Sequence, residues 1–173
     1  TVDGKTFRIT SANCVEYGAL PADKQCGTDS VTGLPKDQQR GWYLDLKEAG
    51  ERVPGDPLVV GSRVIFTSIL PDPDPCKFGG TSWVNILDAV TGKRLSTSFL
   101  GVNNSTVPVT ETSTGFAPSS AQIDSIASAP TAMKAPDLKK TMIYVSTSEG
   151  GVVDLPIVDS EIGRQSWRQV EFQ

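Results

Sequence analysis

Three cysteines are the most reactive side chains of this sequence. Cys14 and Cys26 bracket the short loop VEYGALPADKQ, and Cys76 stands alone. A Cys14–Cys26 disulfide would stabilise the fold by roughly 2–3 kcal/mol and would indicate an oxidising compartment. Pairing of Cys76 with either of the others, and three free thiols, remain open, and any one disulfide leaves a cysteine over. Zinc is not expected, because the chain has no histidine and no C-x-x-C motif.

Other residue types that enzymes use are missing or poorly placed. Without histidine, neither a Ser-His-Asp nor a Cys-His arrangement is available. Gly79-Gly80 suggest a phosphate loop, but an apolar run follows them instead of a lysine and a helix. Asp72 and Asp74 form a carboxylate pair, yet the prolines around them predict a rigid exposed turn. We therefore expect no enzymatic activity and no cofactor in this segment.

Composition narrows the class of protein and its partners. The 173 residues, about one domain, include 12 Pro and 16 Gly, with frequent Val, Ile, Thr and Ser, which favours strands and turns. The net charge is −4 and the pI about 4.8, so nucleic acid is not an expected partner. The sequence has no run of 18 apolar residues that would predict a transmembrane segment. Its first residues hold neither a signal peptide nor a Met, which predicts a mature or excised segment.

A strand followed by a tight turn is the element that must position any functional residue. Residues 82–87, SWVNIL, predict a buried strand, and a second strand is expected to begin near Lys93. Gly92 fits the left-handed last position of the loop AVTG between them. Asp88 can bind the N–H groups of this loop, and Thr91 belongs to the same LDA-TG signature.

The same pattern occurs twice more. The run GWYLDL leads to a turn ending at Gly50, and VVDLPIV leads to Asp159 and Gly163. Gly92 follows Gly50 by 42 positions, which matches a four-stranded propeller blade, and Gly163 follows by 71, a blade plus an insertion. A further hairpin is predicted at 57–67, where PLVV and RVIFT flank a two-residue Gly-Ser loop.

Further strands and long insertions complete the predicted organisation. A strand is expected before each turn pattern, at 6–10, 63–70 and 141–148, and irregular insertions at about 11–40, 71–80 and 101–140. Within the last insertion, a short helix at 119–128 and an extended VPVTETS strand are both open. The sequence thus predicts one all-β segment over 1–173, with antiparallel blade-like hairpins of a partial, modified β-propeller.

Four aromatic residues lie at matching positions beside the predicted hairpins: Trp42, Tyr43, Trp83 and Trp167. Packing between neighbouring blades is the expected role. The alternative is an exposed ring that contacts a sugar or a protein.

The order of motifs over 41–100 resembles a known family. GWY-LDL, ERV, RVIFT, DPC-FGG-SW and LDA-TG follow one another as in the C-terminal region of PilY1-type proteins, which are type IV pilus tip-associated adhesins and assembly factors. The ending GRQSWRQVEF is similar to the C-terminus of that family.

This resemblance implies the C-terminal part of a larger modified β-propeller, located at the cell surface or pilus tip. It implies roles in pilus biogenesis, surface adhesion and twitching motility, with pilins or minor pilins and surface ligands as partners. Family members can bind calcium in an EF-hand-like loop, but PDPDPC at 71–76 lacks that pattern. The integrin-recognition tripeptide RGD of some members is also absent from the sequence.

Three functions compete at this point. The first is a pilus-biogenesis and adhesion module without catalysis, binding through its inserted loops. The second, suggested by LDAVTG, is a fragment of a quinoprotein-like propeller enzyme. The third is a purely structural arc of a larger propeller, with exposed apolar edges.

Overall fold

A computed structural model of the chain describes residues 6–10, 41–74, 79–98, 109–110, 117–135 and 140–158. These residues form ten strands and no helix, and every strand pair is antiparallel. The prediction of an all-β antiparallel fold is therefore confirmed. None of the described segments is a helix long and apolar enough to cross a membrane.

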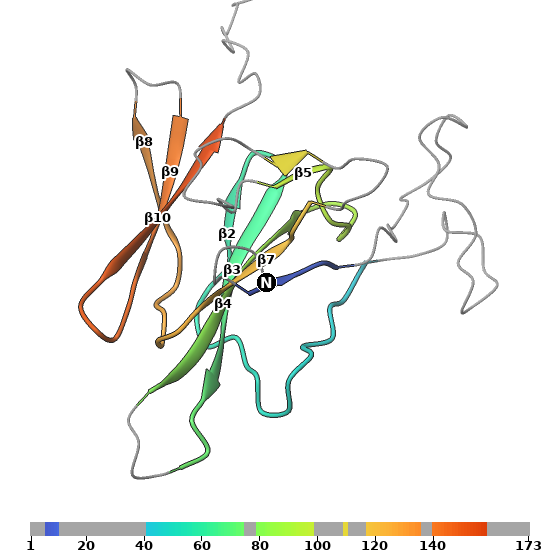
Figure 1. Cartoon of the computed structure of the whole chain (residues 1–173). Helices are drawn as coiled ribbons and strands as arrows, with labels where there is room; N and C mark the ends of the chain where they lie inside the picture. Colours follow the sequence, from blue (N-terminus) through green and yellow to red (C-terminus); the bar gives the residue numbers. More distant parts are fainter. Residues whose placement is uncertain are drawn as a thin grey trace, which may run out of the picture.

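The larger sheet has five strands. They are β1 (Phe7–Arg8), β2 (Leu58–Val60), β3 (Arg63–Pro71), β4 (Gly80–Asp88) and β7 (Ser120–Ile123). Their order in space is β1-β7-β4-β3-β2 (Figure 1). β3 and β4 form its centre and pair along their whole length, because RVIFTSIL and SWVNIL are rich in β-branched and aromatic residues.

Glycines shape the hairpin between β3 and β4. Gly79 and Gly80 have φ angles of 143° and 144°, a conformation that side chains rarely adopt. A Cβ atom at Gly80 would also collide with the carbonyl oxygen of Leu70 on the partner strand. The hairpin therefore requires glycine at both positions for its backbone conformation, and at Gly80 also for close pairing with β3. The first and last residues of the predicted insertion 71–80 belong to the β3–β4 ladder, because Pro71 pairs with Gly80.

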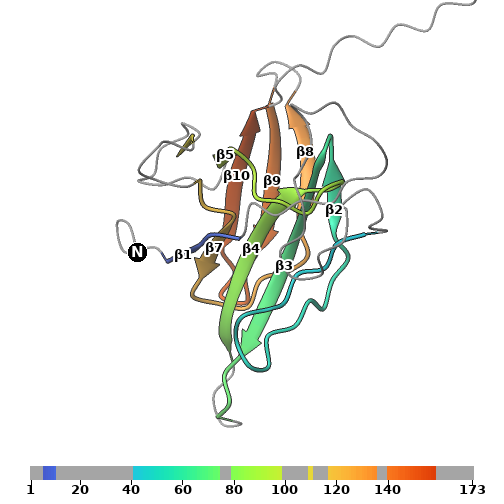
Figure 2. The same ribbon diagram turned by 90° about the vertical axis from the view of Figure 1, so that its right-hand side faces the viewer.

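The smaller sheet has three strands, β8 (Thr131–Ala135), β9 (Lys140–Ser146) and β10 (Val152–Val158), in the order β10-β9-β8. A separate pair joins β5 (Thr97–Ser98) to β6 (Val109–Thr110). Figure 2 shows the smaller sheet lying behind β3 and β4, so the two sheets form two layers.

The hydrophobic core lies between these layers. Ile65, Val84 and Ile86 of the larger sheet pack with Ile143 and Val145 of the smaller one, and all five are nearly inaccessible to solvent. Burial of each such side chain contributes about 1.5–3 kcal/mol. The opposite face of the larger sheet carries Arg8, Trp83 and Asn85, because neighbouring residues of a strand point to opposite faces.

Several predicted hairpins differ in the structure. Residues 41–46 form no strand, and the chain after Gly50 makes only an isolated bridge between Arg52 and Ile69. No strand begins at Lys93, because the free edge of β4 pairs with β7 instead. The predicted 57–67 hairpin does form, with Val60 opposite Arg63 across the Gly-Ser loop.

The predicted irregular region 101–140 also differs. It supplies β7 and β8, so part of it is sheet, and 119–128 is not helical. Two residues of the alternative VPVTETS strand form β6. Among the described residues there is no closed sheet, and blades of a propeller are not identified.

Candidate functional site

A buried ion pair lies on the face of the larger sheet that points away from the smaller sheet. Nη1 of Arg8 donates to both carboxylate oxygens of Glu51, at 2.8 and 2.9 Å, and Nη2 lies 3.4 Å from Glu48 Oε1. The side chain of Glu51 is fully buried, whereas that of Glu48 is 45% exposed. Solvent therefore weakens the Glu48 contact much more than the Glu51 contact.

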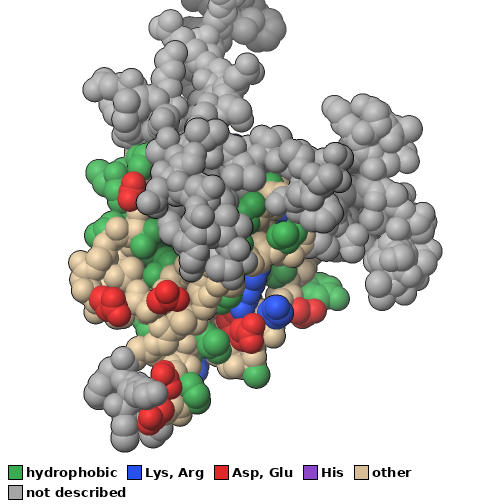
Figure 3. All heavy atoms as spheres, viewed as in Figure 1, with side chains coloured by type: hydrophobic (Ala, Val, Ile, Leu, Met, Phe, Trp, Pro, Cys, Tyr) green, Lys and Arg blue, Asp and Glu red, His purple; other side chains and the backbone are tan. Residues whose placement is uncertain are grey.

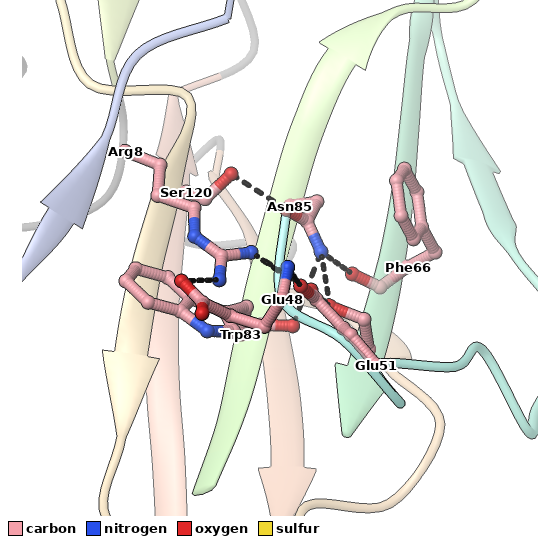
Figure 4. A network of polar contacts seen from close by, with 8 residues as sticks. Arg8, Glu48, Glu51, Phe66, Trp83, Asn85 and Ser120 are labelled. Atoms are coloured by element: carbon pink, nitrogen blue, oxygen red, sulfur yellow. Dashed lines mark hydrogen bonds and ion pairs between the residues drawn. The ribbon is translucent and has the colours of Figure 1, made fainter. Parts of the chain in front are cut away.

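Trp83 supports the cation of this pair. The guanidinium carbon of Arg8 lies 3.7 Å from the centre of the Trp83 ring. Figure 4 shows the Arg8 guanidinium between this ring and the Glu51 carboxylate. Such cation–π contacts contribute about 0.5–2 kcal/mol, more when water is excluded. Trp83 is 5% exposed and packs on the outer face of the larger sheet, not between the two sheets.

A chain of hydrogen bonds extends the ion pair across three strands. Ser68 Oγ donates to Glu51 Oε1, and Asn85 Nδ2 donates to Ser68 Oγ at 3.2 Å. Ser120 Oγ donates to Asn85 Oδ1 at 2.6 Å. The chain links β3, β4 and β7, and its three members are buried. Buried polar groups of this kind hold the sheet in one arrangement when every member is satisfied.

The pKa of Glu51 follows from its surroundings. Burial is the largest influence and by itself raises the pKa. Hydrogen bonds from Arg8, Ser68 and the backbone N–H of Glu48, with the charge of Arg8, outweigh it and hold the pKa below 4.5. Each oxygen of Glu51 accepts two hydrogen bonds, so this carboxylate is suited to structural anchoring and not to proton transfer.

An open cleft of about 460 Å³ lies beside the ion pair. Residues 7–10 and 44–47 form its walls, and Asn85 and Ser120 also line it. Its volume lies within the roughly 300–1,000 Å³ that is usual for ligand pockets. Among the described residues, there is no group of three or more His, Cys, Asp or Glu side chains that could hold a metal ion.

Charges around this region are mixed. In the space-filling view of Figure 3, the visible Lys and Arg side chains lie beside Asp and Glu side chains. Arg8 itself is compensated by Glu48 and Glu51. The described surface in this view therefore has no basic field of the kind that attracts a polyanion.

The turn after β4 has the geometry that the sequence indicated for its loop. Asp88 Oδ1 accepts hydrogen bonds from the N–H groups of Val90 and Thr91, at 3.1 and 2.7 Å, and from Thr91 Oγ1 at 2.7 Å. Gly92 has a φ angle of 70°, in the left-handed region. Trp42 Nε1 donates to Ala89 O at 3.2 Å, and its ring leaves no room for a Cβ atom at Gly92. Trp42 therefore covers this turn and does not belong to the core between the sheets.

The remaining predicted residues are separated from this turn or lie outside the described part. Gly50 has a φ angle of 84° in an open turn, and Tyr43 is 85% exposed. Asp74 donates its backbone N–H to Asp72 Oδ1 at 2.9 Å, within an exposed turn. Six residues lie outside the described residues: Cys14, Cys26, Cys76, Asp159, Gly163 and Trp167.

Sequence reasoning missed the ion pair and its hydrogen-bond chain. The available signal was polar residues inside otherwise apolar strands, Ser68 in RVIFTSIL and Asn85 in SWVNIL. Polar side chains in such strands need buried partners. Arg8 and Glu51 are 43 positions apart, so no local pattern connects them.

Comparison with known proteins finds relatives in one group. The chain is 33% identical to the type IV pilus biogenesis factor PilY1 of Pseudomonas aeruginosa over 96 residues, 53% of this chain and 7% of that protein. A PilY1 homologue of Xylella fastidiosa is 26% identical over 181 residues, 98% of this chain and 14% of the relative. A shorter match to a Xylella fastidiosa homologue is 38% identical over 60 residues. The chain thus spans a small fraction of these relatives, which are pilus biogenesis factors by name.

No protein-family model matches the chain, and no solved structure gives a significant match. The similarity to PilY1 and its homologues is partial and of low identity. It is consistent with a PilY1-like chain and with an association with the cell envelope or surface.

Proposed function

We propose that this chain is a propeller-forming, C-terminal part of a type IV pilus biogenesis factor and acts by binding, not by catalysis. The observation that carries the proposal is the similarity to a PilY1 homologue along 98% of the chain. The chemistry of the described site agrees with it, because the buried carboxylate of Glu51 has both oxygens occupied.

The order of the strands supports a propeller. β2, β3, β4 and β7 lie in the same order along the chain and in space, with β5 and β6 inserted between β4 and β7, and β8, β9 and β10 are consecutive in both. The first strands of the two series, β2 and β8, contact each other. In a propeller, each blade is such a meander, and the first strands of adjacent blades meet around the central channel. We infer that the two sheets are consecutive blades, the second continuing beyond Val158.

Location and partners follow from the same proposal. The chain acts at the cell surface or pilus tip, contacts pilins or minor pilins, and contributes to adhesion and twitching motility. The regions 11–40, 71–80 and 101–140 contribute contacts, and a Cys14–Cys26 disulfide stabilises the first of them. Peptide mapping without reduction tests the disulfide directly, and a crosslink that joins Cys76 to Cys14 or to Cys26 would overturn this pairing.

Replacement of residues 41–158 by a flexible linker in the full-length protein tests the function in its own bacterium. We expect surface pilin to fall in sheared fractions and twitching zones to shrink, while the protein is still produced. An unchanged amount of surface pilin with unchanged twitching and attachment would overturn the proposal. A variant with the linker placed after Gln173 is the matched control for added length.

A further inference from the structure

We propose that the outer face of the smaller sheet is a contact surface for a further β-sheet of the same polypeptide, which stacks on it as the neighbouring blade. This face is formed by Thr131, Met133, Met142, Tyr144, Val152 and Asp154. The inference rests on the propeller of the proposed function and goes beyond it by assigning a docking surface and its occupant.

Strand register places these side chains on one surface. Met133 of β8 lies directly opposite Met142 of β9, and Tyr144 follows on the same side of β9. Because side chains alternate along a strand, the residues between them point to the other surface, where Ile143 and Val145 belong to the core. The outer face therefore points away from the larger sheet, and Figure 1 shows no described strand on that side.

This outer face is apolar and exposed. Met133 and Val152 are each 61% exposed, and Met142 and Tyr144 beside them are half-buried. Figure 3 shows hydrophobic side chains over the smaller sheet, at the left of the view. Single exposed apolar residues are normal on a protein surface, but neighbouring ones on one sheet face are typical of an interface.

The outer face of the larger sheet provides a comparison within the same chain. It carries Phe66, Trp83 and Leu87, which are all nearly inaccessible to solvent. The segment around Glu51 contributes to this cover through its bond from Ser68 of β3. Of the two stacked sheets, the smaller one therefore has the outer face that the described residues leave open.

Both methionines of the chain lie on this open face, directly opposite each other. Methionine is unbranched and polarizable, so it adapts to an irregular apolar partner surface. A charged side chain placed against this pair would be buried without a partner, which is costly. We therefore expect the partner to present apolar side chains to Met133 and Met142.

The arrangement of the two sheets indicates what occupies the face. The larger sheet stacks on the inner face of the smaller one, and the first strands of the two sheets, β2 and β8, contact each other. Repetition of this relationship places a further sheet on the outer face, with its first strand beside β8. Propellers have about four to eight blades, so a ring needs more than these two sheets.

The length of the relatives favours the same polypeptide as the source of this sheet. The PilY1 homologue that matches 98% of this chain has only 14% of its own length in the match, so most of that protein lies outside the matched region. A sheet tethered in the same polypeptide has a much higher effective concentration than a separate partner. It therefore occupies the face in preference to a second copy or another protein.

Photocrosslinking in the purified full-length protein tests the contact. A photoreactive benzoylphenylalanine replaces Met133, and mass spectrometry identifies the peptide to which it bonds. We expect a crosslink within one polypeptide to a segment outside residues 1–173. The control carries the same group in place of Val90, which is 55% exposed in the turn after β4, and we expect no crosslink to that segment.

Oxidation by hydrogen peroxide tests the native methionine. In the full-length Val90→Met variant, we expect Met133 to oxidise about tenfold more slowly than the introduced methionine, although the two positions are similarly exposed in the described chain. Both rates are measured in the same molecules, so the variant contains its own control. The protein is kept at a concentration at which light scattering shows a monomer, which excludes protection by a second copy.

Three results would overturn the inference: a crosslink that joins two polypeptides, crosslinks confined to residues 1–173, or oxidation of Met133 as fast as that of the introduced methionine. Because both readouts use purified protein, their failure is distinct from a failure of the pilus assay in cells. The expected crosslink together with unchanged piliation would keep the docking surface and remove the pilus function. Loss of surface pilin with an unprotected Met133 would do the reverse.

Discussion

Arg8 lies with its guanidinium carbon 3.7 Å from the centre of the Trp83 ring, so a side chain near the start of the chain rests on the middle of the larger sheet. The same guanidinium binds Glu51, which belongs to neither strand. One residue therefore fastens both β1 and the segment around Glu51 onto β4. This relationship makes the N-terminal strand part of the fold's stability as well as one wall of the cleft.

Removal of Arg8 should destabilise the chain strongly. Arg8→Ala leaves the Glu51 carboxylate buried without a cation, and we expect a loss of about 3 kcal/mol in the free energy of unfolding, measured with urea. Arg8→Lys keeps the charge but not the fork of donors, so its loss should be about half as large. Equal stability of Arg8→Ala and the parent chain would show that the ion pair contributes nothing.

Acid should weaken the fold through Glu51. Its pKa in the folded chain lies below the ordinary 4.5, so the unfolded chain binds the proton more tightly. The stabilisation is therefore complete above about pH 5 and is lost as the pH falls through the folded pKa. Glu51→Gln should be less stable than the parent by about 2 kcal/mol at pH 7, and the difference should shrink toward pH 3. Urea unfolding across this pH range measures both curves, and parallel curves would contradict the assignment to Glu51.

Gly92 and Gly50 form a matched pair for testing the Trp42 contact. Both have positive φ angles, 70° and 84°, but only at Gly92 would a Cβ atom collide with another side chain, that of Trp42. Gly50→Ala should cost about 1 kcal/mol from backbone strain alone. Gly92→Ala should cost about 3 kcal/mol and alter tryptophan fluorescence, because the ring must move. Similar costs at the two positions would show that Trp42 does not press on this turn.

The central strands could be predicted because their signals are local. RVIFTSIL and SWVNIL are apolar and β-branched, glycines flank them, and the structure has β3 and β4 there. The pairing of strands is not local. The sequence suggested that SWVNIL would pair with the segment after Gly92, but Ser120–Ile123 occupies that edge.

The short strand β7 was unpredictable from its own composition. SAQI in a Ser-, Thr- and Pro-rich region gives little apolar signal. It becomes a strand because Ala121 lies opposite Val84 at the core and Ser120 meets Asn85 on the other face. Tertiary packing thus overrides local propensity. GWYLDL shows the opposite case. Its alternation of residue types is typical of a strand, but it forms no ladder among the described residues.

Asn85 should show the opposite pH dependence to Glu51. Asn85→Asp places a carboxyl group at a 3%-exposed position near Glu51, where burial and the like charge raise its pKa. The folded chain would then bind the proton more tightly than the unfolded chain. The variant should be destabilised by about 3 kcal/mol at pH 7 and by clearly less at pH 4, where the new carboxyl group becomes protonated.

Asn85→Ala is the control, because it also loses the bond to Ser68 and adds no titrating group, although unlike Asn85→Asp it also removes the acceptor for Ser120 Oγ. Both variants retain Glu51, so the part of its acid response that does not depend on the new carboxylate cancels in the difference between them, and what remains belongs to the coupled pair. That difference should therefore fall as the pH decreases from 7 to 4. If Asn85→Asp and Asn85→Ala keep a constant stability difference over this range, the new carboxyl group is hydrated and the interior around Asn85 is open to water.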